Sequence, residues 1–341
     1  MKRMTFRAFL ASTLVLVCSV SLAQKPRSKN DRSGYDEADR ATVLHVANVY
    51  VLADAAGQPI TTVTPGHEVV VLTRNGPWTN VMVNTDTKED ADPDSAPDFA
   101  DPNTNSDPGT GWIRDKGIVG AKTPHGDAIL FGAAAEFEAQ AEAPHAPKGA
   151  AEAAHLLYRR VGDYFPDSPL AGEAAFRSAD IRWQLDKLDV STLPSAKEQE
   201  AFLRPRLYDG EMKGVMKMYP GTEWEARAAF DLIEDKLCGD WQGLPKCPAM
   251  EADLYVRYAD RYRKGPKSAE ALYDATYRMG AVVTMFLADE NKKQADVATK
   301  NCQALADRVS AEYPNTEWAT RAQAIAYKVS QGIPVYGSDR D

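Results

Sequence analysis

The sequence predicts a protein of two parts, a small all-β barrel followed by an all-α solenoid of stacked helical hairpins. Short valine-rich runs separated by glycine and proline turns occupy residues 41–113. From Asp127 onward the composition changes to Ala, Glu, Leu and Arg at helical spacing, and one aromatic–proline turn recurs along this stretch. At 341 residues the chain is long enough for each part to bury a core of its own.

Residues 1–23 predict a cleaved signal peptide. They carry three basic groups and then an apolar run over residues 8–20, and Ser21-Leu22-Ala23 offers small residues at both positions that a signal peptidase reads. The run is shorter than the roughly 20 apolar residues of a membrane span. We therefore expect a soluble mature protein without a membrane span, periplasmic or extracellular. No lipid anchor is expected on Cys18, because Val17 stands where a small residue is required.

The charge of the chain argues against nucleic acid as a partner. The net charge is −9, and loss of residues 1–23 removes three basic groups and no acidic ones, which lowers it to −12. Such a surface repels phosphate backbones and anionic lipid. Residues 24–38 are polar and charged without periodicity, which predicts a flexible leader.

Residues 39–122 predict the barrel. Short β-prone runs lie at 41–52, 60–63, 69–72, 78–83 and 111–113. Gly66 permits a tight turn after Pro65, and alternating valines are expected to fill a small interior. The rings of Trp78 and Trp112 are expected to add the apolar area that so small a core lacks.

This stretch resembles a bacterial SH3-like domain over about 80 residues. The resemblance is carried by Pro59-Ile60, Val63, Pro65-Gly66, Val69, Val71-Leu72, Gly76, Trp78, Val81 and Gly111-Trp112-Ile113. It implies a barrel that engages a cell-wall peptide or a second protein, with Tyr50, Trp78 and Trp112 as candidate contacts. For the two tryptophans, a place in the core is the alternative. The family's Asn-Val-Arg-Ser-Gly-Pro run is represented only by Asn48-Val49-Tyr50, so the resemblance carries over no ligand type.

An acidic insertion, residues 84–110, interrupts the barrel. Its carboxylates are interspersed with prolines and stand at Asp86, Glu89, Asp90, Asp92, Asp94, Asp98, Asp101 and Asp107. Asp90, Asp92 and Asp94 could present alternate carboxylates to calcium. However, Ser95 replaces the glycine expected next, and no glutamate closes the loop. A solvated acidic extension is the favoured interpretation, and a calcium site is the alternative.

Residues 149–333 predict a repeated helical hairpin, preceded by a linker helix at 123–148 and followed by a tail at 334–341. The repeated turns are Phe165-Pro166-Asp167-Ser168, Tyr219-Pro220-Gly221-Thr222, Tyr313-Pro314-Asn315-Thr316 and the degenerate Tyr262-Arg263-Lys264-Gly265-Pro266. In all four, an alanine stands nine residues after the aromatic residue. Proline ends the first helix, Ser or Thr caps the second, and alanine lets the helices approach closely.

The helices around these turns repeat their apolar positions too. The helix before the first turn and the one before the last carry the same stripe, Ala154, Leu157, Val161, Phe165 and Cys302, Leu305, Val309, Tyr313. Eleven residues after each aromatic stand Phe176, Phe230, Tyr273 and, breaking the series, Ala324. An extra segment, residues 191–206, precedes the second copy.

The repeat resembles the tetratricopeptide type, in particular the divergent kind of bacterial envelope proteins. The resemblance implies stacked helix pairs with a concave face for a protein partner. Trp224 and Trp318 follow the capping threonines at equivalent positions and are the candidate contacts. Packing between neighbouring repeats is the favoured alternative for both.

Three cysteines remain after residue 23. Cys238 and Cys247 can close a short loop in an oxidising compartment, and we favour this disulfide. Metal binding is the alternative, but two thiols with no further cysteine or histidine nearby make a poor zinc site. Cys302 matches Ala154 on the inward face, so we expect a small, buried and unpaired thiol.

The sequence carries no recognisable active-site motif. It lacks His-Glu-x-x-His, Gly-x-Ser-x-Gly, a phosphate-binding glycine loop and Cys-x-x-Cys, and its five histidines show no metal-site spacing. We therefore expect no catalytic residues, no metal centre and no cofactor. The sequence predicts an exported, non-catalytic binding or adaptor protein of the cell envelope. The alternatives are a structural peptidoglycan-anchoring protein and a cell-wall hydrolase.

Overall fold

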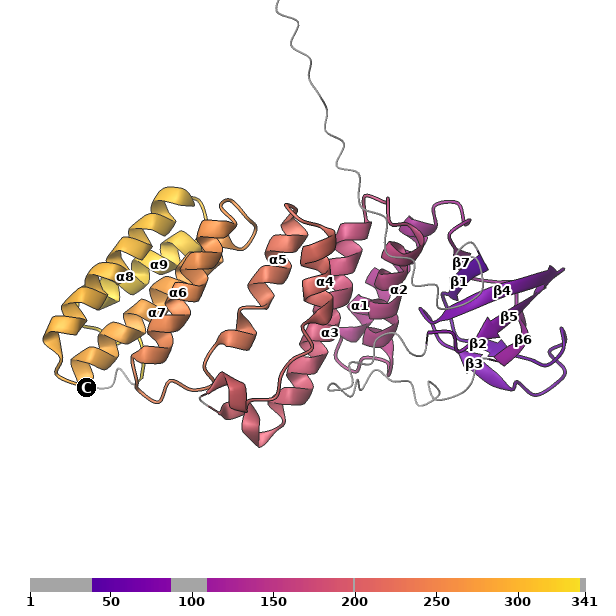
Figure 1. The fold of residues 1–341 in the computed structure, drawn as a ribbon, viewed down its shortest axis with the longest axis horizontal. Coiled ribbons are helices and arrows are strands. Elements are labelled where there is room, and N and C mark those ends of the chain that lie inside the picture. The colour runs from indigo at the N-terminus through magenta and orange to yellow at the C-terminus, as the bar shows by residue number, and fades with distance from the viewer. Residues whose placement is uncertain (1–38, 87–108, 199, 338–341) are drawn as a thin grey trace, which may run out of the picture. The chain divides into compact units, whose positions relative to one another are not determined.

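The computed structural model describes residues 39–86, 109–198 and 200–337. The chain divides into two units, residues 1–34 and 35–341, and every described residue belongs to the second. In the described residues an antiparallel β region precedes nine α-helices (Figure 1). The predicted division into a β part and a helical part is therefore confirmed. The predicted signal peptide and leader, and residues 87–108 of the acidic insertion, lie outside the described residues.

The β region is built from short antiparallel strands. Its described strands are β1 (Arg40–Val43), β2 (Ala47–Val49), β3 (Thr61–Val63), β4 (Glu68–Asn75), β5 (Trp78–Val83), β6 (Gly109–Arg114) and β7 (Ile118–Gly120). Five of them form a sheet in the order β6-β5-β4-β1-β7, and β2 pairs with β3. A bridge between Tyr50 and Trp112 joins the end of β2 to β6. This bridge connects the two-stranded sheet to the five-stranded sheet by backbone hydrogen bonds.

Small aliphatic side chains fill the interior of the β region. The buried cluster consists of Ala41, Val43, Ala47, Val49, Val63, Val69, Val81, Val83 and Ile113. Along β5, Thr79, Val81 and Val83 are at most 2% exposed, so they point inward and the residues between them point outward. By this alternation Trp78 belongs to the outer face. Neither tryptophan joins the aliphatic cluster, which consists of valines from the first five strands with Ala41, Ala47 and Ile113, although Trp78 is itself buried at 6% exposed.

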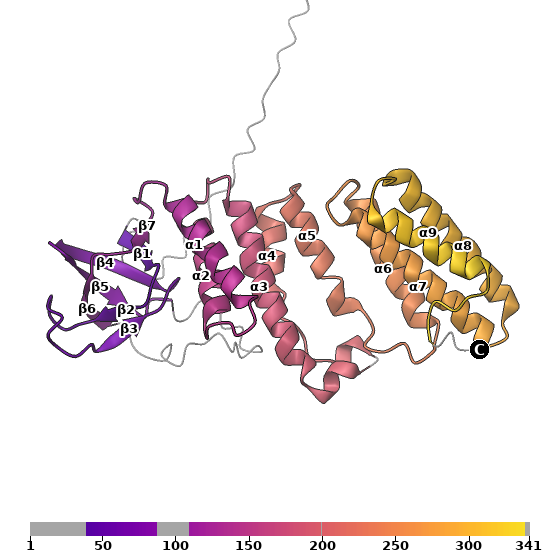
Figure 2. The ribbon, with the colours of Figure 1, turned by 180° about the vertical axis from the view of Figure 1, so that it is seen from behind.

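The helical part continues to the end of the described chain. Its helices are α1 (Gly126–Ala141), α2 (Ala150–Tyr164), α3 (Ala171–Ser191), α4 (Gly210–Met218), α5 (Glu223–Asp231), α6 (Lys246–Arg261), α7 (Ser268–Ala288), α8 (Lys292–Glu312) and α9 (Glu317–Ser330). Consecutive helices pack on one another within α1–α3, α4–α5 and α6–α9. Both views show α6 to α9 side by side (Figures 1 and 2). None of the described helices is both long and apolar enough to span a membrane.

Helix α1 does more than link the two parts. It packs along α2, where the rings of Phe131 and Tyr158 meet edge-on with centroids 5.1 Å apart. The Tyr158 hydroxyl also donates to Glu138 of α1 at 2.7 Å. The segment expected to be a linker therefore forms the first layer of the helical packing.

The four repeated turns share one backbone conformation. The aromatic residue that ends each first helix has φ between −136° and −107° and ψ between 50° and 59°. Its N–H donates to the carbonyl four residues earlier in every copy. The alanines nine residues later, Ala174, Ala228, Ala271 and Ala322, are all 0% exposed. The spacing found in the sequence thus produces the same turn and the same close helix contact four times.

The predicted caps form at two of the three turns. Thr222 and Thr316 accept hydrogen bonds from the N–H groups of Glu225 and Ala319, at 3.4 and 3.3 Å. Ser168 does not cap α3, which begins only after Leu170. Its hydroxyl donates to Asp127 of α1 at 2.7 Å and accepts from the Leu170 N–H at 3.2 Å, ahead of the first residue of α3, so the expectation of a cap is wrong at this turn.

A buried arginine connects the β region to α2. The Arg160 side chain is 6% exposed; its Nε donates to the carbonyl of Gly66 at 3.0 Å, and its Nη2 pairs with Asp86. Burial alone would raise the pKa of Asp86, but Arg160 and then His67 outweigh it and hold that pKa well below the ordinary value. Gly66 has φ +88°, and a Cβ there would lie 2.5 Å from the Leu156 side chain of α2. Glycine is needed at this position for the turn and for the contact with the helix.

Candidate binding face on the β region

Three aromatic residues meet on the outer face of the β region. Tyr50 exchanges both backbone hydrogen bonds with Trp112 of β6, at 2.9 and 2.7 Å. Directly opposed residues of antiparallel strands project from the same face. The register also pairs Trp112 with Asn80 and Trp78 with Arg114 across β5 and β6. The candidates Tyr50, Trp78 and Trp112 therefore share one face, which together with Arg114 we call the aromatic face.

Trp78 forms the base of this face. The Tyr50 ring stands edge-on to it, with centroids 5.7 Å apart and planes at 87°. The Arg114 guanidinium carbon lies 4.1 Å from the centre of the Trp78 ring. Trp78 is consequently only 6% exposed, whereas Tyr50 and Trp112 are half-buried and Arg114 is exposed. The last three residues are the accessible part of the face.

Large apolar side chains near the aromatic face are also exposed. Val51, Leu52 and Ile60 are 65%, 69% and 55% exposed. The N–H of Ile60 donates to the carbonyl of Val49 at 2.8 Å, which holds Ile60 beside β2. Apolar side chains gathered at a surface mark a contact region for a partner. We therefore consider these three residues together with the aromatic face as a candidate contact region.

Arg114 has no carboxylate within ion-pair distance among the described residues. The other arginines of the described strands differ: Arg40 pairs with Glu68 at 3.3 Å, and Arg74 pairs with Asp115. Stacking on a ring leaves the in-plane N–H groups of a guanidinium available to an anion. Sequence reasoning missed Arg114. The signal was its place two residues after Trp112 in a strand, which puts both side chains on one face.

The helical tryptophans have different surroundings. Trp224 stacks on Phe176 of α3, with centroids 5.9 Å apart, and lies so close to Gly172 that a Cβ there would be 2.7 Å from its ring. Trp318 of α9 lies on Tyr273 of α7 at 5.3 Å. Both rings are half-buried in contacts between one helical hairpin and the next.

These contacts belong to a series. The residue eleven positions after a turn aromatic meets the residue five positions after the next one, in the pairs Phe176–Trp224, Phe230–Lys267 and Tyr273–Trp318. The middle pair is a cation–π contact at 5.3 Å. Ala324, which breaks the series, is exposed on the last described helix. The series ends where the described helices provide no further hairpin to receive an aromatic ring.

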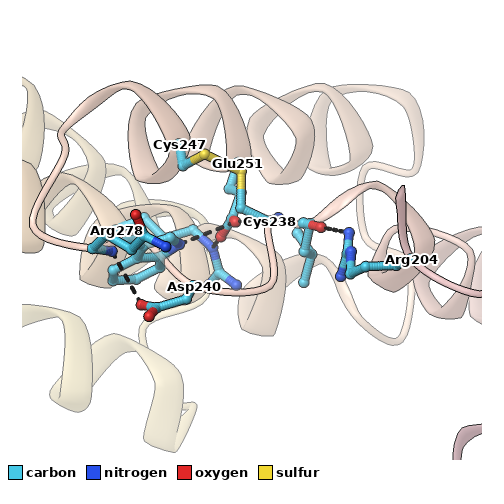
Figure 3. The surroundings of a disulfide bond; sticks show 9 residues. Arg204, Cys238, Asp240, Cys247, Glu251 and Arg278 are labelled. Atoms are coloured by element: carbon cyan, nitrogen blue, oxygen red, sulfur yellow. Dashed lines mark hydrogen bonds and ion pairs between the residues drawn. A yellow bond between two sulfur atoms is a disulfide. The ribbon is translucent and has the colours of Figure 1, made fainter. Parts of the chain in front are cut away.

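The predicted disulfide between Cys238 and Cys247 is present. Beside it, the buried Glu251 accepts hydrogen bonds from the Cys238 N–H, Trp241 Nε1 and Arg278 Nε at 2.8, 3.1 and 2.7 Å (Figure 3). The ring of Trp241 lies 5.3 Å from that of Tyr336, so the beginning of the predicted tail packs on this loop. The disulfide closes a loop that the Glu251 carboxylate also holds, through the Cys238 N–H and the Trp241 ring, and it is a structural feature.

The extra segment at 191–206 carries a second exposed apolar surface. Leu193, Phe202 and Leu203 are 44%, 74% and 53% exposed, and Leu188 at the end of α3 is 64% exposed. The segment borders a hollow of about 1020 Å³ between α3 and α4. The Arg204 guanidinium donates to the carbonyl of Leu237, which ties the segment to the disulfide loop (Figure 3).

The remaining candidates give no further site. Asp90, Asp92 and Asp94 lie outside the described residues, so the structure does not address the calcium alternative. The part of the chain that is described holds no group of three His, Cys, Asp or Glu side chains suited to a metal. Cys302 is unpaired and buried, and its thiol donates to the Thr276 carbonyl at 3.6 Å. Burial raises the pKa of this thiol to about 12.

Comparison with known proteins adds no assignment: no protein-family model matches the chain, and no curated protein matches it.

Proposed function

We propose that the protein is an exported, non-catalytic binding protein of the bacterial envelope, an adaptor that engages one partner through its β region and another through its helices. The observation that carries the proposal is the aromatic face. Tyr50 and Trp112 are half-buried on the outer face and lie outside the buried aliphatic cluster of the interior. Aromatic residues and arginine are enriched where proteins bind partners.

Within this proposal the β region is an SH3-like module, and its ligand is a cell-wall peptide or a second protein. The short antiparallel strands, with a bridge between β2 and β6, agree with such a module. The apolar rim of Val51, Leu52 and Ile60 would extend the contact area beyond the three rings. An extended peptide laid across this face would cover apolar surface that is otherwise in water.

The helices are, in the same proposal, tetratricopeptide-like repeats that hold a protein partner. Their turns and inter-hairpin contacts recur, which agrees with stacked helix pairs. Since Trp224 and Trp318 are engaged in those contacts, the segment around Phe202 is the better candidate for a partner. Export is supported by the basic and apolar residues 1–23 and by the Cys238–Cys247 disulfide, which suits an oxidising compartment.

The first test is co-sedimentation of the protein, from residue 24 onward, with purified peptidoglycan. We expect sedimentation of the parent and its loss in a Tyr50→Ala/Trp112→Ala variant. Tyr327→Ala is the matched control, because Tyr327 is an aromatic residue of α9 that is 65% exposed and lies outside the face. Circular dichroism establishes that each variant is folded.

The second arm uses envelope extract and compares the parent with Phe202→Ser and Tyr327→Ser. A partner retained by the parent and by Tyr327→Ser, but lost from Phe202→Ser, supports the adaptor. Sedimentation that depends on Trp112, without any partner that depends on Phe202, supports a peptidoglycan anchor in its place. If neither substitution changes any binding, the proposal is wrong.

A further inference from the structure

One member of the aromatic face, Arg114, is a cation. Arg114 is exposed and stacked on Trp78, and no described carboxylate lies within ion-pair distance of it. The sequence has 49 acidic residues and 40 basic ones, so carboxylates are in excess. On other strands of the same sheet, Arg40 of β1 and Arg74 of β4 both have carboxylate partners. A guanidinium that no described carboxylate neutralises, on the binding face of an acidic protein, points to an anionic group in the ligand.

The geometry of the guanidinium limits which kinds of anion suit this site. A guanidinium presents its N–H groups in one plane, which matches the two oxygens of a carboxylate. A polyanion such as a phosphate backbone would be repelled by the net charge of −9. A single carboxylate therefore fits this site better than a highly charged ligand.

The surroundings of Arg114 define the rest of the ligand. The guanidinium is 4.1 Å from the centre of the Trp78 ring, and that ring is 5.7 Å from Tyr50. The cation and the Tyr50 ring thus both contact the ring of Trp78. The ligand must carry its carboxylate next to an apolar group, an arrangement found in the last residue of a peptide that ends in a small aliphatic amino acid.

We propose that the aromatic face recognises the free C-terminal carboxylate of a peptide whose last residue is apolar. Arg114 pairs with the carboxylate, Trp112 and Tyr50 cover the apolar side chain, and Trp78 holds Arg114 in place. This assignment rests on the proposed binding function and adds to it the chemical class of the ligand.

The test is a titration of the 15N-labelled protein, from residue 24 onward, followed through its tryptophan indole signals. The probe is acetyl-Gly-Gly-Ala-Ala with a free carboxylate, and the matched probe is the same peptide with a C-terminal amide. Trp78→Phe and Trp112→Phe assign two of the six indole signals. We expect the free acid to shift the Trp112 signal, and the amide to bind about tenfold more weakly.

Variants separate the charge from the aromatic surface. Arg114→Gln should lower the affinity for the acid to that for the amide, whereas Arg74→Gln, which changes an exposed arginine of β4, should leave both unchanged. Trp112→Ala should abolish binding of both peptides. Raising the salt concentration should weaken binding of the acid more than that of the amide.

The outcomes distinguish this inference from the function on which it rests. Equal binding of acid and amide, or an unchanged Arg114→Gln variant, overturns carboxylate recognition and leaves the binding function standing. Carboxylate recognition alone is also overturned if neither peptide binds while co-sedimentation still depends on Tyr50 and Trp112. If that dependence is absent as well, both fail.

Discussion

Trp112 of the β region and Trp318 of the helical part are both half-buried, yet their neighbours differ. Trp318 lies on Tyr273 in a contact that recurs, with related residues, at the two earlier junctions between hairpins. Trp112 lies on a sheet face with an arginine that has no carboxylate partner among the described residues. Partial exposure alone therefore does not identify a binding residue. A contact that recurs along the chain indicates packing, and an aromatic residue left outside a filled core indicates binding.

The largest effect is expected where the two parts join. Arg160→Ala should lower the free energy of unfolding by about 3–5 kcal/mol, because it leaves the buried Asp86 without its cation. We further expect the single unfolding transition to separate into two, since Arg160 also holds the Gly66 turn against α2. Urea unfolding, followed by fluorescence and by circular dichroism, measures both.

Arg159→Ala is the matched control for this junction, because the neighbouring side chain is 28% exposed and pairs with Asp163 on its own helix. We expect it to change the stability by less than about 0.5 kcal/mol. A loss of under about 1 kcal/mol in Arg160→Ala would show that the two parts do not depend on this contact.

The comparison of tryptophans itself predicts a clear difference in stability. Trp318→Ala and Trp224→Ala should each cost about 3 kcal/mol, because each removes a ring that packs between hairpins. Trp112→Ala should lower the free energy of unfolding by less than about 1 kcal/mol and should weaken peptidoglycan binding. Thermal unfolding of the three variants, with co-sedimentation of each, provides the measurement. Equal losses in all three would remove the distinction between the two regions.

Removing the disulfide should destabilise the helical part by about 2–3 kcal/mol. The disulfide joins two residues with a sequence separation of 9, and without it the unfolded chain gains conformational entropy. A Cys238→Ala/Cys247→Ala variant, compared with the parent by urea unfolding, measures this. The aromatic face should be unaffected, so peptidoglycan binding serves as the control. If the variant loses peptidoglycan binding as well as stability, the aromatic face depends on the helical part, contrary to our expectation.

The smallest effect concerns pH. Burial first, and then the nearby Asp180 and Glu234, raise the pKa of Asp231 to about 7. The folded protein therefore binds a proton here more tightly than the unfolded chain does, and stability should rise as the pH falls from about 8 to about 5. Asp231→Asn should flatten this part of the profile, whereas Asp253→Asn, at an exposed position of α6, should leave it unchanged. A melting temperature of the parent that decreases as the pH is lowered over this range would contradict the assignment.

The helical turns illustrate what a sequence can predict. The spacing from each aromatic residue to its alanine lies within a single hairpin, and all four alanines are fully buried as expected. The disulfide and the change from strands to helices were predicted for the same reason, since each depends on residues close together in the chain. The cap expected at Ser168 failed because α3 begins only at Ala171, and the Ser168 hydroxyl donates instead to Asp127, 41 residues away.

The aromatic face was only partly predictable. Alternation along β5 and β6 places Trp78 with Asn80, and Trp112 with Arg114, but the run Val69-Val70-Val71 is apolar on both faces and does not show which face is inside. Without knowing which face points outward, the sequence does not identify Arg114 as a residue of an exposed face.

The sequence by itself determined the local geometry, because periodicity, turn residues and cysteine spacing act over a few residues. Only the tertiary structure decided the contacts between distant segments. Arg160 reaches Gly66 across 94 positions, and each aromatic of the helical series meets its partner in the following hairpin. Such contacts depend on the path of the chain in space, which brings together side chains whose separation in the sequence follows no short period.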